Sequence, residues 1–153
     1  MIVADANHLG GFTLYVEDGK LKHTYAFLGV FEYRQVSTET VPTGEVNVEL
    51  VFAADEAKPA TPGEVTLFIN GTPVGGGRMD HTVPFGFSGY SGMDIGEDSG
   101  LVVDRNYVGK APFAFTGTIR KVVFDVAPHP STDDEQTLHE HAQQATTVQG
   151  MNA

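Results

Sequence analysis

Between Pro84 and Val126 the sequence concentrates the side chains that could do chemistry. The carboxylates of this stretch are Asp94, Glu97, Asp98, Asp104 and Asp125. Such a density of hard oxygen ligands could bind calcium, and a pair of carboxylates could act as acid and base on a glycosidic bond. The loop at 94–100 does not follow the EF-hand spacing, and no Glu-x-Asp-x-x-Glu pattern places three carboxylates on one strand face. We therefore predict a polar loop without catalytic residue, metal or cofactor, and keep calcium binding by Asp94 and Asp98 as an alternative.

The other nucleophile and metal motifs are incomplete. Ser88 and Ser91 lie among glycines, but neither completes the Gly-x-Ser-x-Gly pattern of a hydrolase nucleophile. The glycines at 75–77 lack the Lys-Ser/Thr ending of a phosphate loop. His139 and His141 are two residues apart, which makes at most a weak adventitious zinc or nickel site. We expect the isolated histidines to be solvated or locally hydrogen-bonded: His8, His23, His81 and His129.

The same stretch could instead bind a sugar. Glycan sites combine an exposed aromatic face with carboxylate or amide hydrogen bonds, and two tyrosines flank the acidic loop. The predicted ligand-binding residues are Tyr90, Asp94, Asp98, Asp104 and Tyr107. The chain has no tryptophan, and most of its aromatic residues fall on alternating strand positions that would face a core.

Composition limits the class of protein. A chain of 153 residues fits one domain with one core, and the absence of cysteine leaves stability to packing alone. A net charge of −11 with scattered basic residues argues against nucleic acid and acidic membrane surfaces as partners. We find neither a signal peptide nor 18 consecutive apolar residues, so we expect a soluble chain. The compartment stays open, with the cytoplasm slightly favoured.

Alternating apolar and polar residues predict a series of short strands. Asp18-Gly19 and Asn70-Gly71 are turn dipeptides that tolerate positive φ, so each is expected to join a hairpin. Residues 58–63 are expected to form a loop, because their two prolines cannot donate backbone hydrogen bonds within a sheet. The predicted strands cover residues 12–16, 21–27, 31–36, 45–52, 65–69, 74–79 and 119–126.

These strands predict an all-β fold of residues 1–127. About eight short strands with many glycines and prolines favour a two-sheet antiparallel β-sandwich, with jelly-roll, concanavalin-like connections. Residues 128–153 form a polar, acidic tail that we expect to be disordered or to hold a short helix at 131–145.

The order of these segments resembles the C-terminal domain of large bacterial arylsulfatases. The similarity extends over nearly all of residues 2–126. It is carried by the runs Gly10–Val16, Asp18–Leu21, Gly63–Gly71, Thr82–Ser88, Met93–Val103 and Pro112–Ile119.

The resemblance implies an accessory sandwich that packs against a sulfatase catalytic domain. In that family the catalytic domain attacks a sulfate ester with a formylglycine made from a Cys/Ser-x-Pro-x-Arg motif at a calcium site. This chain has no such motif, so no catalytic residue carries over and we expect no enzyme activity. The alternative is a carbohydrate-binding module for sulfated glycans, and a small glycoside-active enzyme is a distant third. Exposed interdomain surface also predicts self-association into a homo-oligomer.

Overall fold

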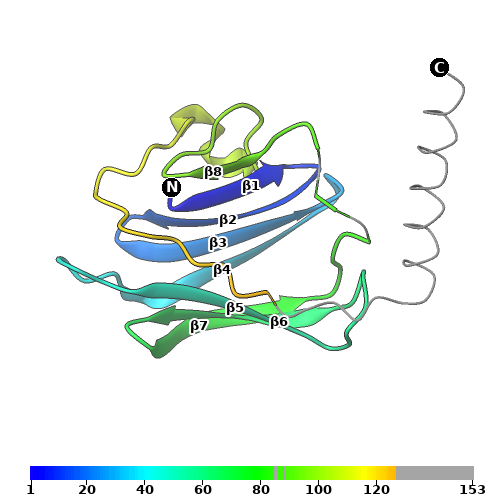
Figure 1. Cartoon of the computed structure of the whole chain (residues 1–153), viewed down its shortest axis with the longest axis horizontal. Coiled ribbons are helices and arrows are strands. Elements are labelled where there is room, and N and C mark those ends of the chain that lie inside the picture. The colour runs from blue at the N-terminus through cyan, green and yellow to red at the C-terminus, as the bar shows by residue number, and fades with distance from the viewer. Residues whose placement is uncertain (85, 88, 127–153) are drawn as a thin grey trace, which may run out of the picture. The chain divides into compact units, whose positions relative to one another are not determined.

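The chain folds mainly into β-strands that form two antiparallel sheets. The computed structural model describes residues 1–84, 86–87 and 89–126 (Figure 1). The five-stranded sheet has the order β4-β3-β2-β1-β8, with β1 Val3–Asn7, β2 Gly10–Glu17, β3 Lys20–Phe27, β4 Phe31–Thr40 and β8 Met93–Ile95. The three-stranded sheet has the order β5-β6-β7, with β5 Val48–Ala54, β6 Gly63–Ile69 and β7 Thr72–Met79. A 3-10 helix, η1, covers Arg105–Lys110.

Both predicted hairpins are confirmed, and their turn residues explain them. Asp18 and Gly19 join β2 to β3 with φ of 52° and 73°, and Asn70 and Gly71 join β6 to β7 with φ of 50° and 79°. Two successive residues with positive φ make the two-residue turn whose twist matches that of the strands. The turns therefore fix which side chains of each hairpin share a face.

The main core lies between the two sheets. It contains Val3, Leu14, Leu21, Tyr25, Val65, Leu67, Ile69, Val74 and Met79. Alternation along each strand sends these side chains to one face. A second cluster, of Met1, Ala4, Tyr15, Val102 and Tyr107, packs on the opposite face of the five-stranded sheet. The five-stranded sheet is therefore covered on both faces, which explains the nearly continuous burial of β2 and β3.

The two sheets approach each other closely where β4 meets β7. Thr38 Oγ1 donates a hydrogen bond of 2.9 Å to the carbonyl of Val74. A Cβ atom added to Gly75 would lie 2.7 Å from the carbonyl oxygen of Val36. Glycine at position 75 is therefore required for this contact.

Replacing Gly75 with alanine is expected to destabilise the fold by about 1–3 kcal/mol, because the new methyl group meets backbone that cannot move aside. Gly77 is the matched control on the same strand. Its added Cβ would meet only the Gln35 side chain, at 3.5 Å. Urea unfolding measures the free energy of unfolding of the alanine variants at positions 75 and 77. An equal loss of stability in both variants would contradict the proposed steric cause.

Two strands and one loop differ from the sequence-based prediction. The prediction of a strand at 119–126 is wrong, since these residues form no strand. Alternation gives a segment the capacity to pair, but residues 119–126 form no backbone hydrogen bond with another described residue. β1 and β8 were not predicted, because each is short and owes its burial to neighbouring strands.

The predicted tail, 128–153, lies outside the described residues. No helix in the described ranges is long and apolar enough to span a membrane.

Candidate functional site

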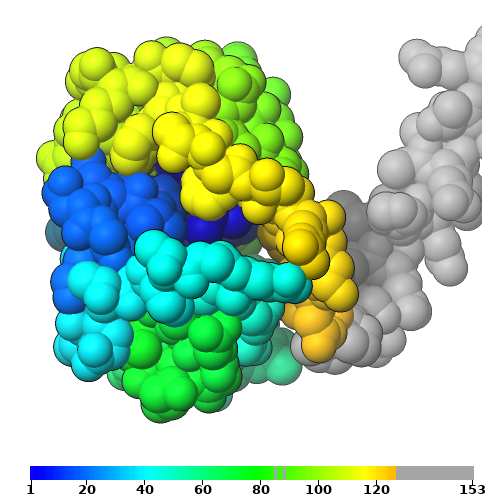
Figure 2. All heavy atoms as spheres, turned by 90° about the vertical axis from the view of Figure 1, so that its left-hand side faces the viewer, coloured from blue at the N-terminus to red at the C-terminus, as the bar shows by residue number. Residues whose placement is uncertain are grey.

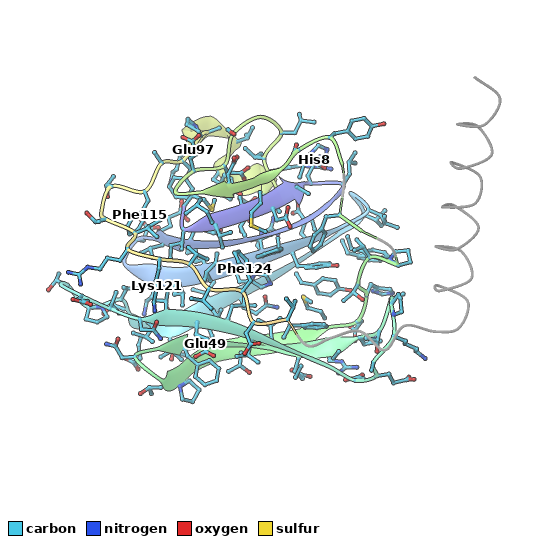
Figure 3. All side chains as sticks on the ribbon, viewed as in Figure 1. His8, Glu49, Glu97, Phe115, Lys121 and Phe124 are labelled. Carbon is cyan, nitrogen blue, oxygen red and sulfur yellow. The ribbon has the colours of Figure 1, made fainter. Side chains whose placement is uncertain are left out.

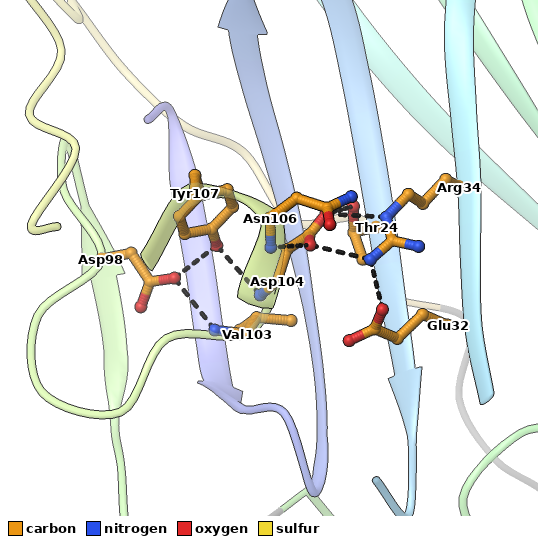
Figure 4. Close-up of polar contacts among 8 residues, drawn as sticks. All are labelled: Thr24, Glu32, Arg34, Asp98, Val103, Asp104, Asn106 and Tyr107. Atoms are coloured by element: carbon orange, nitrogen blue, oxygen red, sulfur yellow. Dashed lines mark hydrogen bonds and ion pairs between the residues drawn. The ribbon is translucent and has the colours of Figure 1, made fainter. Parts of the chain in front are cut away.

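Three of the five predicted ligand-binding residues meet on the outer face of the five-stranded sheet. Asp98, Asp104 and Tyr107 belong to the segment 96–113, which covers this face and includes η1 (Figure 4). Each of the three is at most 2 % exposed. Asp104 is the N-cap of η1, and its Oδ1 accepts a hydrogen bond of 2.8 Å from the amide of Asn106. Capping satisfies a backbone donor that the helix start leaves unpaired.

Asp104 fastens this segment to the sheet through Arg34 and Thr24. Arg34 binds the carboxylate with two nitrogens, Nε at 3.0 Å from Oδ2 and Nη2 at 2.9 Å from Oδ1. Thr24 Oγ1 donates to Oδ2 at 2.7 Å. Thr24 and Arg34 are directly opposite each other on β3 and β4, so both side chains reach the same face. Arg34 also contacts Glu32 on the same strand.

The charge on Asp104 is stabilised in spite of its burial. Burial alone would raise the pKa of this carboxyl, but the hydrogen bonds from Arg34, Thr24 and the Asn106 amide together hold its pKa below the usual range. The pKa of Arg34 is raised by the hydrogen bond to Asp104, against a smaller opposing effect of desolvation. The pair is therefore ionised at neutral pH, and both oxygens of Asp104 accept hydrogen bonds.

Asp98 and Tyr107 form a second buried contact beside the first. Tyr107 donates its hydroxyl hydrogen to Asp98 and accepts a hydrogen bond of 3.4 Å from the amide of Asp104. The amide of Val103 also donates to Asp98, at 3.1 Å. Burial raises the pKa of Asp98, and burial together with the Asp98 contact raises the pKa of Tyr107. Tyr107 and Asp98 therefore link the two ends of the segment 98–107 within the protein.

The other two predicted residues are placed differently. Asp94 on β8 is half-buried and accepts hydrogen bonds from the amide and the hydroxyl of Ser99, at 2.8 Å and 2.6 Å. Tyr90 is 89 % exposed and takes part in none of the hydrogen bonds above. Within residues 1–84, 86–87 and 89–126, no three His, Asp or Glu side chains are placed to hold a metal ion.

The arrangement favours a structural role for these carboxylates. A general acid or base must reach the proton that it transfers, and a sugar ligand must reach its hydrogen-bonding partners. Asp98 and Asp104 are buried, Tyr107 and Val103 both donate to Oδ2 of Asp98, and Arg34 and Thr24 donate to the oxygens of Asp104. What the cluster can do is hold segment 96–113 against the sheet.

Sequence analysis missed Arg34 and Thr24 as parts of this cluster. A signal for them was present, because the register of a β3–β4 hairpin would place the two residues opposite each other. The carboxylate that this exposed arginine binds is itself buried. The partner is 70 residues away in the sequence, so local patterns could not identify it.

A polar pair also lies in the main core. His23 on β3 is buried, and its Nδ1 is 2.7 Å from the carbonyl oxygen of Thr13. Gln35 on β4 lies directly opposite His23. Among the described residues, neither His23 Nε2 nor Gln35 Oε1 has a hydrogen-bonding partner. Burial lowers the pKa of His23 to about 4, so this histidine is neutral at pH 7.

Comparison of the chain with protein-family models, curated proteins and solved structures gives no match in any of the three.

Proposed function

We propose that this chain is a non-catalytic accessory domain of an arylsulfatase-like protein, which packs against a sulfatase catalytic domain and stabilises it. The resemblance of residues 2–126 to the C-terminal domain of such enzymes supports the proposal, as does the two-sheet fold. Concanavalin-like, jelly-roll connectivity is part of the same proposal. The domain would contribute surface and stability, while the reaction takes place on its partner.

The observation that carries the proposal is that the acidic segment 96–113 acts as a structural clamp, which means that its carboxylates hold it against the five-stranded sheet. The densest carboxylates of the sequence could have formed an active site, but Asp98 and Asp104 are buried and hydrogen-bonded within the fold. Apolar side chains such as Val30 and Val123 are instead exposed, at 70 % and 72 %. In the proposed complex the catalytic domain would cover apolar side chains of this kind.

The neighbouring coding sequence and a binding assay test the proposal. We expect a sulfatase catalytic domain in frame with this chain or adjacent to it. That catalytic domain, expressed separately, should copurify with the chain and gain stability of about 3 kcal/mol at a chain concentration a hundredfold above the Kd. The chain alone should hydrolyse no p-nitrophenyl sulfate. Absence of binding to such a domain, or sulfatase activity of the chain itself, would contradict the proposal.

Sulfated-glycan binding is the second candidate, and the exposure of Tyr90 favours it. An aromatic ring that protrudes into solvent can stack on a sugar face. Glycan-array binding with and without EDTA tests this candidate together with the calcium alternative at Asp94. Replacement of Tyr90 by alanine should abolish a genuine signal, and a signal that persists would place the sugar elsewhere.

A further inference from the structure

Two buried polar side chains face the interior of the main core side by side. His23 on β3 lies directly opposite Gln35 on β4, so both side chains point to the same face of the sheet. That face is the inner one, because His23 is also paired with the core residue Leu14 of β2. His23 is 2 % exposed and Gln35 is 5 % exposed. Figure 3 shows side chains filling the space between the two sheets, where this pair lies.

The hydrogen bond to Thr13 fixes the position of the hydrogen on the His23 ring. Nδ1 is 2.7 Å from the carbonyl oxygen of Thr13, and a carbonyl oxygen can only accept a hydrogen bond. Nδ1 therefore carries the hydrogen. A neutral imidazole has one ring hydrogen, so Nε2 is a bare acceptor. Oε1 of Gln35 is an acceptor as well, and neither atom has a partner among the described residues.

Two neighbouring acceptors require a donor that serves both. They cannot bond to each other, and a buried polar atom without a partner opposes folding. The donor must carry two hydrogens and be small enough for a packed core. A metal ion would need more ligands, and no three His, Asp or Glu side chains in the described part of the chain are placed to hold one. A water molecule meets both requirements.

The packing around Gln35 can accommodate a molecule of this size. Gly77 on β7 is paired with the core residue Val65, so it faces the same interior. A Cβ atom added there would be 3.5 Å from Nε2 of Gln35, an ordinary contact distance, whereas one added to Gly75 would clash with the backbone of β4. Figure 2 shows the cyan end of β4 packed directly against the green strand β7. The two sheets are therefore in close contact near Gly75 and less tightly filled beside Gln35.

We propose that one internal water molecule is bound in the main core between β3 and β4, where it donates one hydrogen to Nε2 of His23 and the other to Oε1 of Gln35. Internal waters typically bridge polar groups that secondary structure leaves unpaired. The water links the two strands through their side chains. It also stabilises the neutral imidazole, because a donor at Nε2 favours the unprotonated nitrogen. This site is independent of the proposed function.

Nuclear magnetic resonance on the full chain tests the site. Long-range proton–nitrogen correlation identifies the tautomer of His23, and we expect the hydrogen on Nδ1 and none on Nε2 at neutral pH. Water-selective laboratory-frame and rotating-frame Overhauser spectra should show cross-peaks between water and the ring hydrogens of His23. These cross-peaks should have opposite signs in the two spectra, which distinguishes a bound water from bulk water and from hydrogen exchange.

Two variants test whether both acceptors hold the water. Gln35→Met preserves the length of the side chain and removes Oε1. The water cross-peaks should disappear in this variant, because a single acceptor in apolar surroundings does not retain a water molecule. Val36→Thr is the control, since Val36 is the adjacent residue of β4 and is 49 % exposed. This variant should leave the cross-peaks unchanged. The spectra of the unaltered chain test the site even if Gln35→Met fails to fold.

Three results would overturn the proposal. Cross-peaks from the side-chain amide hydrogens of Gln35 to the His23 ring, without a water signal, would show a direct hydrogen bond after rotation of the amide. A hydrogen on Nε2 in place of Nδ1 would remove the acceptor that the water requires. Water cross-peaks that persist in Gln35→Met would show that Gln35 takes no part in binding the water.

Discussion

Replacing Asp104 with alanine is expected to destabilise the folded chain by about 2–3 kcal/mol, because it removes a buried carboxylate that several donors share. The Arg34 side chain is 35 % exposed and keeps Glu32 as a partner, whereas Thr24 and the Asn106 amide lose their acceptor. The N-cap of η1 is lost at the same time. Urea unfolding followed by circular dichroism measures the loss.

Three variants separate the charge from the packing. Asp104→Asn keeps the shape and should cost about 1–2 kcal/mol, because a neutral amide cannot accept both nitrogens of Arg34. Arg34→Met should cost less in the Asp104→Asn background than in the unaltered chain, since the ion pair is already broken there. Asp80→Ala removes an exposed carboxylate 3.6 Å from Arg78 and should change stability by less than about 1 kcal/mol. Equal effects at positions 104 and 80 would refute the clamp.

Acidification from pH 7 to pH 4 is expected to destabilise the chain by about 3 kcal/mol through His23 alone. Burial lowers the pKa of His23 to about 4 in the folded state, whereas an unfolded histidine titrates near its model value of 6.5. Between these values the unfolded chain binds more protons than the folded chain, so stability rises with pH across this window. The contribution is complete above the unfolded pKa and is lost as the pH falls toward the folded pKa.

Comparison with His23→Gln isolates this effect from other titrations. Glutamine can still donate to the Thr13 carbonyl but takes up no proton, so the stability of the unaltered chain relative to this variant should fall by about 3 kcal/mol from pH 7 to pH 4. The raised pKa of Asp98 acts in the opposite direction, because protonation of this carboxyl favours the folded state. Asp98 is present in both proteins and cancels in the difference. Parallel curves from pH 4 to pH 7 would contradict the assignment to His23.

Local patterns were sufficient where one short-range rule decides the structure. Asp18-Gly19 and Asn70-Gly71 identified two hairpins, since their backbone conformation depends on the turn residues themselves. Alternation identified β5 and most of β4, although β4 extends to Thr40 and β5 begins at Val48. Strand ends depend on the partner strand, so the prediction placed them less accurately than the strands themselves.

The candidate site illustrates what local patterns miss. Asp98, Asp104 and Tyr107 were grouped correctly as neighbours because they are close in the sequence. Their burial depends on Thr24 and Arg34, which approach from β3 and β4 across more than half of the domain. A carboxylate on a surface loop and a carboxylate in a buried clamp have the same local sequence, and only the contacting groups distinguish them.

The stretch 119–126 makes the same point for secondary structure. Its residues alternate as those of β6 do, but they form no backbone hydrogen bond with a described strand, and a strand requires such pairing. The sequence by itself determined an acidic, cysteine-free, mostly β chain with two defined hairpins, because composition and turn chemistry act locally. Tertiary structure alone decided that the acidic segment is held against the sheet and that residues 119–126 form no strand. Burial, ion pairing and edge pairing are relations between segments distant in the chain, and they exist only once those segments meet.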